Sequence, residues 1–329
     1  MRSQTTSCVL MIRPESFGSN PETRATNAFQ GALDAPPPEI RRRALVEFDT
    51  LVARLREEGV EVFVFGDSLE PATPDAVFPN NWFTAHEDGT VTLYPMQPES
   101  RRGERRPDIF ESLVEDHGFH VSRFLDLTDG EESGIFLEGT GSLVLDHPGR
   151  VGYAALSART RTPLLQRFAG AFHHEIVSFR ATDRGLPIYH TNVILSIGGG
   201  FAVLAEETID DPEERARVRE ALQAGGRRVV PITREQVRAF AGNLLELKDG
   251  RGDPLIACSA GAWASLDATT RGRLQEHGRI LAVPIPTIET VGGGGVRCML
   301  AELFLPRLRV GEGGLPPRPT TTGDAPHRG

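Results

Sequence analysis

The sequence has few cysteines, almost no lysine and no long hydrophobic run. No stretch reaches the roughly 18 consecutive apolar residues that a membrane-spanning helix needs. The apolar run that follows Cys8 is only four residues long, which is too short for the core of a signal peptide. The three cysteines, at positions 8, 258 and 298, lie too far apart for metal-ligand spacing or a disulfide framework. These absences predict a cytoplasmic protein that is not embedded in a membrane.

The net charge is also unlike that of a nucleic-acid-binding protein. The 329-residue chain carries a formal charge of −9, which disfavours contact with a phosphate backbone. Its 39% hydrophobic and 25% charged residues are typical of an ordinary globular protein. We therefore expect a small-molecule partner, an amino-acid substrate as argued below, rather than a nucleic acid or a membrane. The sequence leaves homo-oligomerisation open.

Helical segments that end in glycine recur along the chain at a nearly constant spacing. The glycines are 59, 52, 55 and 53 residues apart, and each is followed by a run rich in β-branched and aromatic residues. Glycine can close a helix in the left-handed conformation, and such a run is typical of a strand. The five segments end at Gly59, Gly118, Gly170, Gly225 and Gly278.

Between these helices lie pairs of apolar runs joined by turn residues, which predict hairpins. The pairs are 81–85 with 91–94, 141–145 with 151–155, 192–196 with 201–204, and 243–247 with 254–258. The repeating unit is therefore strand, strand, helix, strand, and about five copies indicate a solenoid, a propeller or an array. We expect one α/β domain over residues 1–310 and a disordered tail over 311–329, which is rich in Pro, Gly and Thr.

A single cysteine follows four consecutive glycines near the C-terminus, in the run Val291–Cys298. The apolar residues Met299–Leu305 then predict a helix, with the thiol at or near its first turn, where unpaired N–H groups favour an anion. A cysteine in that place can ionise and attack carbon. Alternatively, Cys298 is a small buried hydrophobe at a glycine-rich bend.

The repeat also places polar residues at equivalent positions, which we call the register of the repeat. Polar residues begin the central apolar strands at spacings of 57, 52, 53 and 55 residues, namely Asn81, Glu138, His190 with Asn192, Asn243 and Cys298. In a closed ring of five units these positions would converge, so that an acid, a histidine and a thiol would face one another. Asn243 has no evident role, and a turn or strand-edge asparagine is the simpler interpretation.

Five short motifs resemble those of the guanidine-modifying, or amidinotransferase, superfamily. They are Asp75-Ala-Val-Phe-Pro-Asn-Asn81, Leu137-Glu-Gly-Thr-Gly141, Ser157-Ala-Arg-Thr160, Tyr189-His-Thr-Asn192 and Gly292–Met299. The superfamily includes arginine and agmatine deiminases, dimethylargininases, N-succinylarginine dihydrolases, glycine amidinotransferases and citrulline-utilisation hydrolases. The resemblance covers roughly residues 8–308 and implies a five-bladed α/β propeller, or pentein, of ββαβ units.

The resemblance also implies roles for individual residues. It makes Cys298 the nucleophile, His190 the general acid and base, and Glu138 the catalytic acid. It provides candidates for binding the substrate carboxylate, which are Arg159, Arg101 and, as an equal claimant in the same loop, Arg102. The chemistry needs no metal and no organic cofactor.

Two departures from the family pattern are informative. Deiminases and dimethylargininases carry an acid where this chain has Asn81, and deiminases carry one where it has Asn192. A carboxylate pairs with a cationic guanidinium, whereas an amide can also bond the oxygen and nitrogens of a neutral urea. The two amides favour a ureido substrate such as citrulline, or a guanidino group carried through two hydrolyses, and Asp75 remains as a cation contact.

We therefore predict a hydrolase that cleaves C–N bonds of a ureido or guanidino group of a citrulline- or arginine-like amino acid, through a covalent cysteine adduct. The alternatives are an amidinotransferase, a deiminase of arginine or dimethylarginine, and a non-catalytic propeller used for binding. The polar segment 13–27 is either a flap over the site or a plain surface loop.

Overall fold

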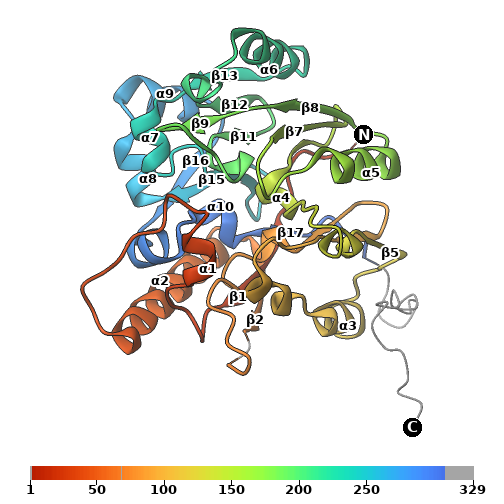
Figure 1. The fold of residues 1–329 in the computed structure, drawn as a ribbon, viewed down its shortest axis with the longest axis vertical. Coiled ribbons are helices and arrows are strands. Elements are labelled where there is room, and N and C mark those ends of the chain that lie inside the picture. The colour runs from red at the N-terminus through yellow and green to blue at the C-terminus, as the bar shows by residue number, and fades with distance from the viewer. Residues whose placement is uncertain (1, 68, 308–329) are drawn as a thin grey trace.

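The computed structural model describes residues 2–67 and 69–307, so the tail predicted over 311–329 lies outside the described residues. Within these ranges the chain forms a mixed α/β fold with several small sheets (Figure 1). Five of these sheets have three strands each, and a sixth is the hairpin of β9 (Thr182–Asp183) and β10 (Leu186–Pro187).

Four of the three-stranded sheets each come from one continuous stretch of chain. They are β3 (Phe83–Ala85), β4 (Thr90–Leu93) and β5 (Arg123–Asp126); β6 (Val144–Asp146), β7 (Val151–Ala155) and β8 (Glu175–Phe179); β11 (Leu195–Ile197), β12 (Phe201–Leu204) and β13 (Arg228–Pro231); and β14 (Leu245–Lys248), β15 (Pro254–Ser259) and β16 (Arg279–Val283). In each sheet the first two strands are antiparallel and the last two are parallel. The four predicted hairpins are confirmed.

The fifth sheet joins the two ends of the described chain. Strand β1 (Cys8–Arg13) pairs in parallel with β2 (Glu61–Gly66) and antiparallel with β17 (Ala301–Glu302). The helix predicted over Met299–Leu305 is therefore wrong. Only Val296–Met299 forms one helical turn, α10, because the apolar residues after it extend to pair with β1 inside the core.

The longer helices lie around the outside of the molecule (Figure 1). They are α2 (Pro37–Glu57), α3 (Pro107–Glu115), α5 (Thr162–Phe172), α6 (Pro212–Ala224) and α9 (Ala268–Gln275). Helix α2 buries Phe48, Leu51 and Leu55 on one face against β1, β2 and β16, and each such side chain contributes about 1.5–3 kcal/mol. Among the described residues, no helix has the length and apolarity that a membrane crossing requires.

The glycine caps are only partly as predicted. Gly59 and Gly118 have the left-handed backbone, with φ of 80° and 70°, whereas Gly170, Gly225 and Gly278 do not. Helix α5 continues through Gly170 because its apolar face extends to the buried Phe172, and His173 (φ 55°) takes the left-handed position instead.

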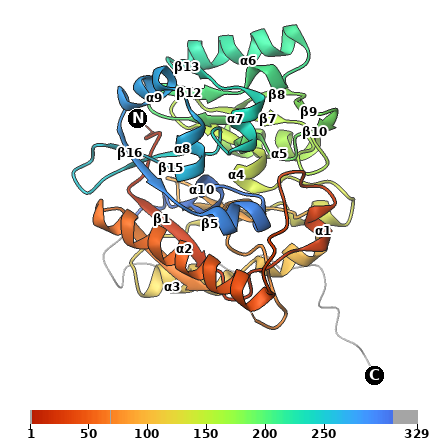
Figure 2. The ribbon, with the colours of Figure 1, turned by 90° about the vertical axis from the view of Figure 1, so that its left-hand side faces the viewer.

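Short helical turns precede the first strands of the sheets and contact one another. They are η1 (Pro79–Asn81), α4 (Gly139–Ser142), η4 (Thr191–Val193) and α10. Turn α4 contacts both η1 and η4, and α10 contacts η1, so the polar residues of the predicted register meet in one region. The N-terminal segment with α1 (Pro21–Arg24) lies outward of α4 and α10 on the same side of the molecule (Figure 2).

Candidate active site

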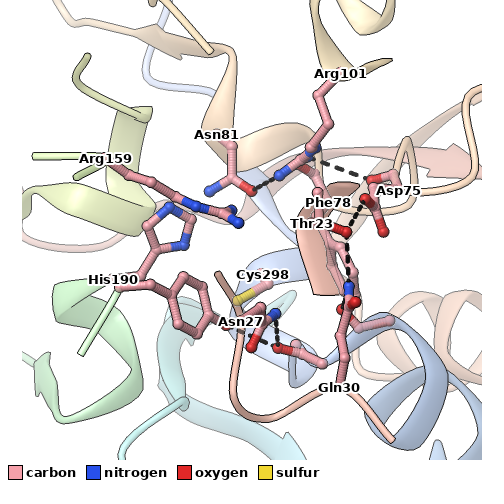
Figure 3. A pocket seen from close by; sticks show the side chains of 14 residues that line it. Thr23, Asn27, Gln30, Asp75, Phe78, Asn81, Arg101, Arg159, His190 and Cys298 are labelled. Carbon is pink, nitrogen blue, oxygen red and sulfur yellow. Dashed lines mark hydrogen bonds between the residues drawn. The ribbon is translucent and has the colours of Figure 1, made fainter. Parts of the chain in front are cut away.

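Six of the eight predicted site residues line one small cavity (Figure 3). They are Asp75, Asn81, Arg101, Arg159, His190 and Cys298. The other two lie directly behind the cavity wall, where Glu138 bonds to His190 and Asn192 bonds to Cys298. The cavity has a free volume of about 20 Å³, which is room for about one water molecule. A substrate can therefore enter only when part of the wall moves.

Cys298 lies in the one-turn helix α10, after the glycine-rich run that begins at Gly292. Its side chain is 4% exposed and faces the cavity. Two amides approach the sulfur, with the Nδ2 atoms of Asn243 at 3.2 Å and Asn192 at 3.6 Å from Sγ. The expected long helix is absent from the described chain after Cys298, so these amides replace a helix N-terminus as the donors near the thiol.

Burial disfavours ionisation of the Cys298 thiol. Burial raises the pKa of Cys298 above its usual value, against the opposing effects of the Asn243 hydrogen bond and the charge of Arg297. Nucleophilic attack therefore requires that a base accept the thiol proton, or that a bound cation stabilise the thiolate.

We expect the alkylation rate of Cys298 by iodoacetamide to keep rising beyond pH 9, because only the thiolate reacts and its pKa is raised above 9.0. Between pH 7 and pH 9 the rate should increase about tenfold per pH unit. Peptide mapping by mass spectrometry separates this residue from Cys8 and Cys258, whose burial raises each pKa to about 12. A rate that levels off below pH 8 would contradict the expectation.

His190 and Glu138 form a buried pair. The Nε2 atom of His190 lies 2.8 Å from Oε2 of Glu138, whose other oxygen accepts the backbone N–H of Gln97 at 2.9 Å. Burial lowers the pKa of His190 to about 4 although Glu138 opposes this, so the ring is neutral. Burial opposes ionisation of Glu138, yet the charge of Arg159 and the His190 hydrogen bond lower its pKa to about 2. An ionised carboxylate can only accept hydrogen bonds, so Nε2 of His190 carries the ring proton. Nδ1 of His190 is then the atom that can accept a proton.

Arg101, and not Arg102, faces the cavity. Arg101 is 3% exposed, and its guanidinium donates two 2.8 Å hydrogen bonds to the Glu104 carboxylate and one of 2.9 Å to Oδ1 of Asn81. Arg102 instead donates to the carbonyl of Met96 at 3.2 Å, outside the cavity. Since Oδ1 of Asn81 accepts from Arg101, its Nδ2 group must be turned the other way, toward the side of His190 and Arg159 (Figure 3).

Arg159 and Asp75 each present a free polar atom. Nη2 of Arg159 donates to Thr26 at 2.6 Å, while its Nε has no partner among the described residues. Oδ2 of Asp75 accepts from Asn20 at 2.7 Å and from Thr23 at 3.0 Å, and its Oδ1 is likewise unpartnered within residues 2–67 and 69–307. The cavity therefore offers a cationic group at Arg159 and an anionic group at Asp75, which lie on opposite sides of it (Figure 3).

The N-terminal strap, residues 20–31, covers this cavity. Asn27 donates to the carbonyl of Gly293 and Gln30 to that of Gly292, both at 3.1 Å. Thr23 completes the strap side of the wall (Figure 3). Residues 20–27 of the predicted segment 13–27 are therefore not a plain surface loop, and the opening of the segment as a flap stays a prediction.

Sequence reasoning missed several residues of the site. The largest omission is Asn243, which was given no role although its position in the register pointed to the centre. Thr23, Asn27 and Gln30 carry no family motif and reach the site only through the long-range contacts of the strap. Over the described ranges, no group of three or more His, Cys, Asp or Glu is arranged to hold a metal ion.

Comparison with known proteins relates the chain to enzymes of arginine chemistry. A family model described as N,N dimethylarginine dimethylhydrolase, eukaryotic, matches residues 13–305. Comparison with the curated proteins finds no match.

Two kinds of solved structure resemble the fold. ArgZ, an arginine dihydrolase from the ornithine–ammonia cycle in cyanobacteria, has a TM-score of 0.70 at 20% identity over 92% of this chain, which spans only 41% of that protein. The substrate-bound N-terminal domain of ArgZ is covered to 99%, with a TM-score of 0.69 at 20% identity over 91% of this chain. A dimethylarginine dimethylaminohydrolase has a TM-score of 0.60 at 17% identity, over 89% of this chain and 98% of that one. At these identities the likeness shows a shared fold.

Proposed function

The chain belongs to the N,N-dimethylarginine dimethylhydrolase family, and from this premise we propose that it is a cysteine-dependent hydrolase. It acts on C–N bonds of the guanidino or ureido group of an arginine-like amino acid. The observation that carries the proposal is the meeting of Cys298, the His190–Glu138 pair and two arginines at one small cavity. A thiol, a base and anion-binding groups are the components that covalent hydrolysis of an amino acid needs.

The substrate is oriented by its α-amino acid end. Arg159 and Arg101 bind the α-carboxylate, because a guanidinium matches a carboxylate in charge and geometry. The free Oδ1 of Asp75 accepts from the α-ammonium group. The opposite end of the substrate then meets Cys298 and the surrounding amides.

The reaction begins when Sγ of Cys298 attacks the central carbon. Nδ1 of the neutral His190 accepts the thiol proton, and the imidazolium is stabilised by its Nε2–H bond to ionised Glu138. His190 then gives the proton to the departing nitrogen, which leaves as an amine or ammonia. In the second half His190 takes a proton from water, the water oxygen attacks the adduct, and the C–S bond breaks.

The orientation of the Asn81 side chain favours an enzyme that also binds and hydrolyses a neutral ureido group. Arg101 fixes Oδ1, and Nδ2 has no partner within the part of the chain that the structure describes. An N–H donor facing the cavity suits a carbonyl oxygen better than the N–H groups of a guanidinium. Hydrolysis of a ureido group yields an amine, ammonia and carbon dioxide, so arginine carried through both stages yields ornithine, two ammonia molecules and carbon dioxide.

We also propose that the five three-stranded sheets are the blades of one α/β propeller, in a single catalytic domain over residues 1–310. Their common strand order and the contacts among η1, α4, η4 and α10 support this arrangement. The backbone N–H of Lys248 donates to the carbonyl of Thr6 at 2.9 Å, which joins the last sheet to the first.

The test is to incubate the protein separately with L-arginine, L-citrulline and Nω,Nω-dimethylarginine, and to measure ammonia, ornithine and citrulline. Ornithine with ammonia from citrulline is the expected result. Citrulline that accumulates from arginine would instead identify a deiminase, and a product that forms only with an added amine would identify an amidinotransferase. No turnover, together with a Cys298 that resists alkylation, would favour the binding propeller.

Asn81→Asp is expected to lower citrulline hydrolysis about 10- to 100-fold, because the carboxylate removes the only side-chain donor at this position and leaves the ureido oxygen unpaired. Arginine should then be converted to a larger fraction of citrulline, since the new carboxylate pairs with a guanidinium. The ratio of citrulline to ornithine by chromatography measures the change. Asn80→Asp, which alters a buried amide outside the cavity wall, is the matched control. An unchanged ratio in Asn81→Asp would rule out this role.

A further inference from the structure

Asn243 lies behind the nucleophile, in the turn between α7 (Arg234–Arg238) and β14. Its side chain is completely buried and does not line the cavity. Nδ2 makes two hydrogen bonds, one of 2.9 Å to the backbone carbonyl of Asn192 and one of 3.2 Å to Sγ of Cys298. The amide therefore bridges the turn of His190 to the thiol.

The direction of this amide is fixed by its first partner. The carbonyl oxygen of Asn192 can only accept, so the NH₂ group of Asn243 must face it, and the second hydrogen then points to the sulfur. Oδ1 of Asn243 is buried and has no partner among residues 2–67 and 69–307. Burying this unpaired carbonyl is unfavourable, so placing the amide beside the thiol lowers the stability of the fold.

The backbone around Asn243 is also strained and closely packed where it brings the Asn243 amide to the Cys298 thiol. Phe240, three residues before Asn243, has φ of 60°, a left-handed conformation that a bulky side chain rarely adopts. A Cβ on Gly242 would lie 2.3 Å from the carbonyl oxygen of Val193, and one on Gly295 would lie 2.7 Å from Oδ1 of Asn243. The strained Phe240 and the close approach of Gly242 to Val193 thus hold the Asn243 turn against the neighbouring turn. Gly295 leaves the space that the Asn243 side chain occupies.

We propose that Asn243 is a positioning residue, which donates a hydrogen bond to Cys298 Sγ, stabilises the thiolate and holds it for attack. The bond is strongest when the sulfur carries negative charge, so it acts after the thiol proton has left and before the C–S bond forms. This inference rests on the proposed function, since it assigns Asn243 a part in the same covalent step.

The test measures the pH dependence of Cys298 alkylation by iodoacetamide in the wild type and in Asn243→Ala, with no substrate present. Loss of one hydrogen bond to a charged group should slow alkylation at pH 8 by about 10- to 100-fold and move the profile to higher pH. In turnover, kcat should fall by a similar factor while KM stays near the wild-type value, because Asn243 does not contact the substrate cavity.

Two further variants separate this role from a loss of folding. Leu244→Ala removes a buried side chain from the same turn and should lower stability without moving the alkylation profile. Gly295→Ala should move the profile as Asn243→Ala does, because its Cβ would displace Oδ1. Superimposable profiles for the wild type and Asn243→Ala, or an equal shift in Leu244→Ala, would overturn the proposal. Since alkylation needs no substrate, a wild type that turns over nothing tests the proposed function separately.

Discussion

Cys298→Ser is expected to lower turnover by about 10⁴-fold or more, because a serine hydroxyl is a far weaker nucleophile than a thiolate. The neighbouring base cannot compensate. A hydroxyl is a much weaker acid than a thiol, so His190 removes its proton far less readily. The rate of ornithine formation measures the loss, and mass spectrometry of protein quenched during turnover should find an adduct on Cys298 only in the wild type.

Cys258→Ala is the matched control for this experiment. Cys258 is also buried, at 1% exposure, but it lies in the core outside the cavity. Its replacement should leave the turnover of folded protein unchanged. The Cys298→Ser variant should still bind the substrate in calorimetry, because the groups that hold the α-amino acid end remain. Turnover above about a tenth of the wild-type rate in Cys298→Ser would refute a nucleophilic role.

The register of the repeat predicted the meeting of the site residues because a repeat fixes equivalent positions in space. Glu138, His190 and Cys298 each lie in or beside the helical turn before the first strand of a unit. The contacts among these turns bring residues more than a hundred positions apart to one cavity. The same register also contained Asn243, which lies beside Cys298. Its position in the repeat therefore predicted a place at the site better than its residue type did.

Other features depend on partners that are distant in the sequence. Met299–Leu305 is apolar throughout, and such a run fits a buried helix and a buried strand equally well until its pairing with β1 is known. The strap reaches the site through contacts such as Asn27 with Gly293, which no local pattern encodes. The sequence placed the thiol at the first turn of a longer helix, whereas Cys298 lies in a turn of four residues and burial raises its pKa.

Arg101→Ala is expected to lower the free energy of unfolding by about 3–5 kcal/mol, since it leaves the buried Glu104 carboxylate without its cation. Burial already raises the pKa of Glu104 to about 7 despite the attraction of Arg101. Arg102→Ala should cost less than about 1 kcal/mol, because its pairs with Glu99 and Glu131 are longer and partly exposed. Denaturant unfolding of the two variants measures this difference between adjacent arginines.

The double variant Arg101→Met with Glu104→Gln separates stability from substrate binding. It removes both charges of the buried pair, so most of the lost stability should return. The anchor for the substrate carboxylate and the fixed orientation of Asn81 remain absent, so KM should stay at least about tenfold above the wild-type value. If the double variant regained both stability and a wild-type KM, Arg101 would be a structural residue only, and Arg159 would be left as the single carboxylate anchor.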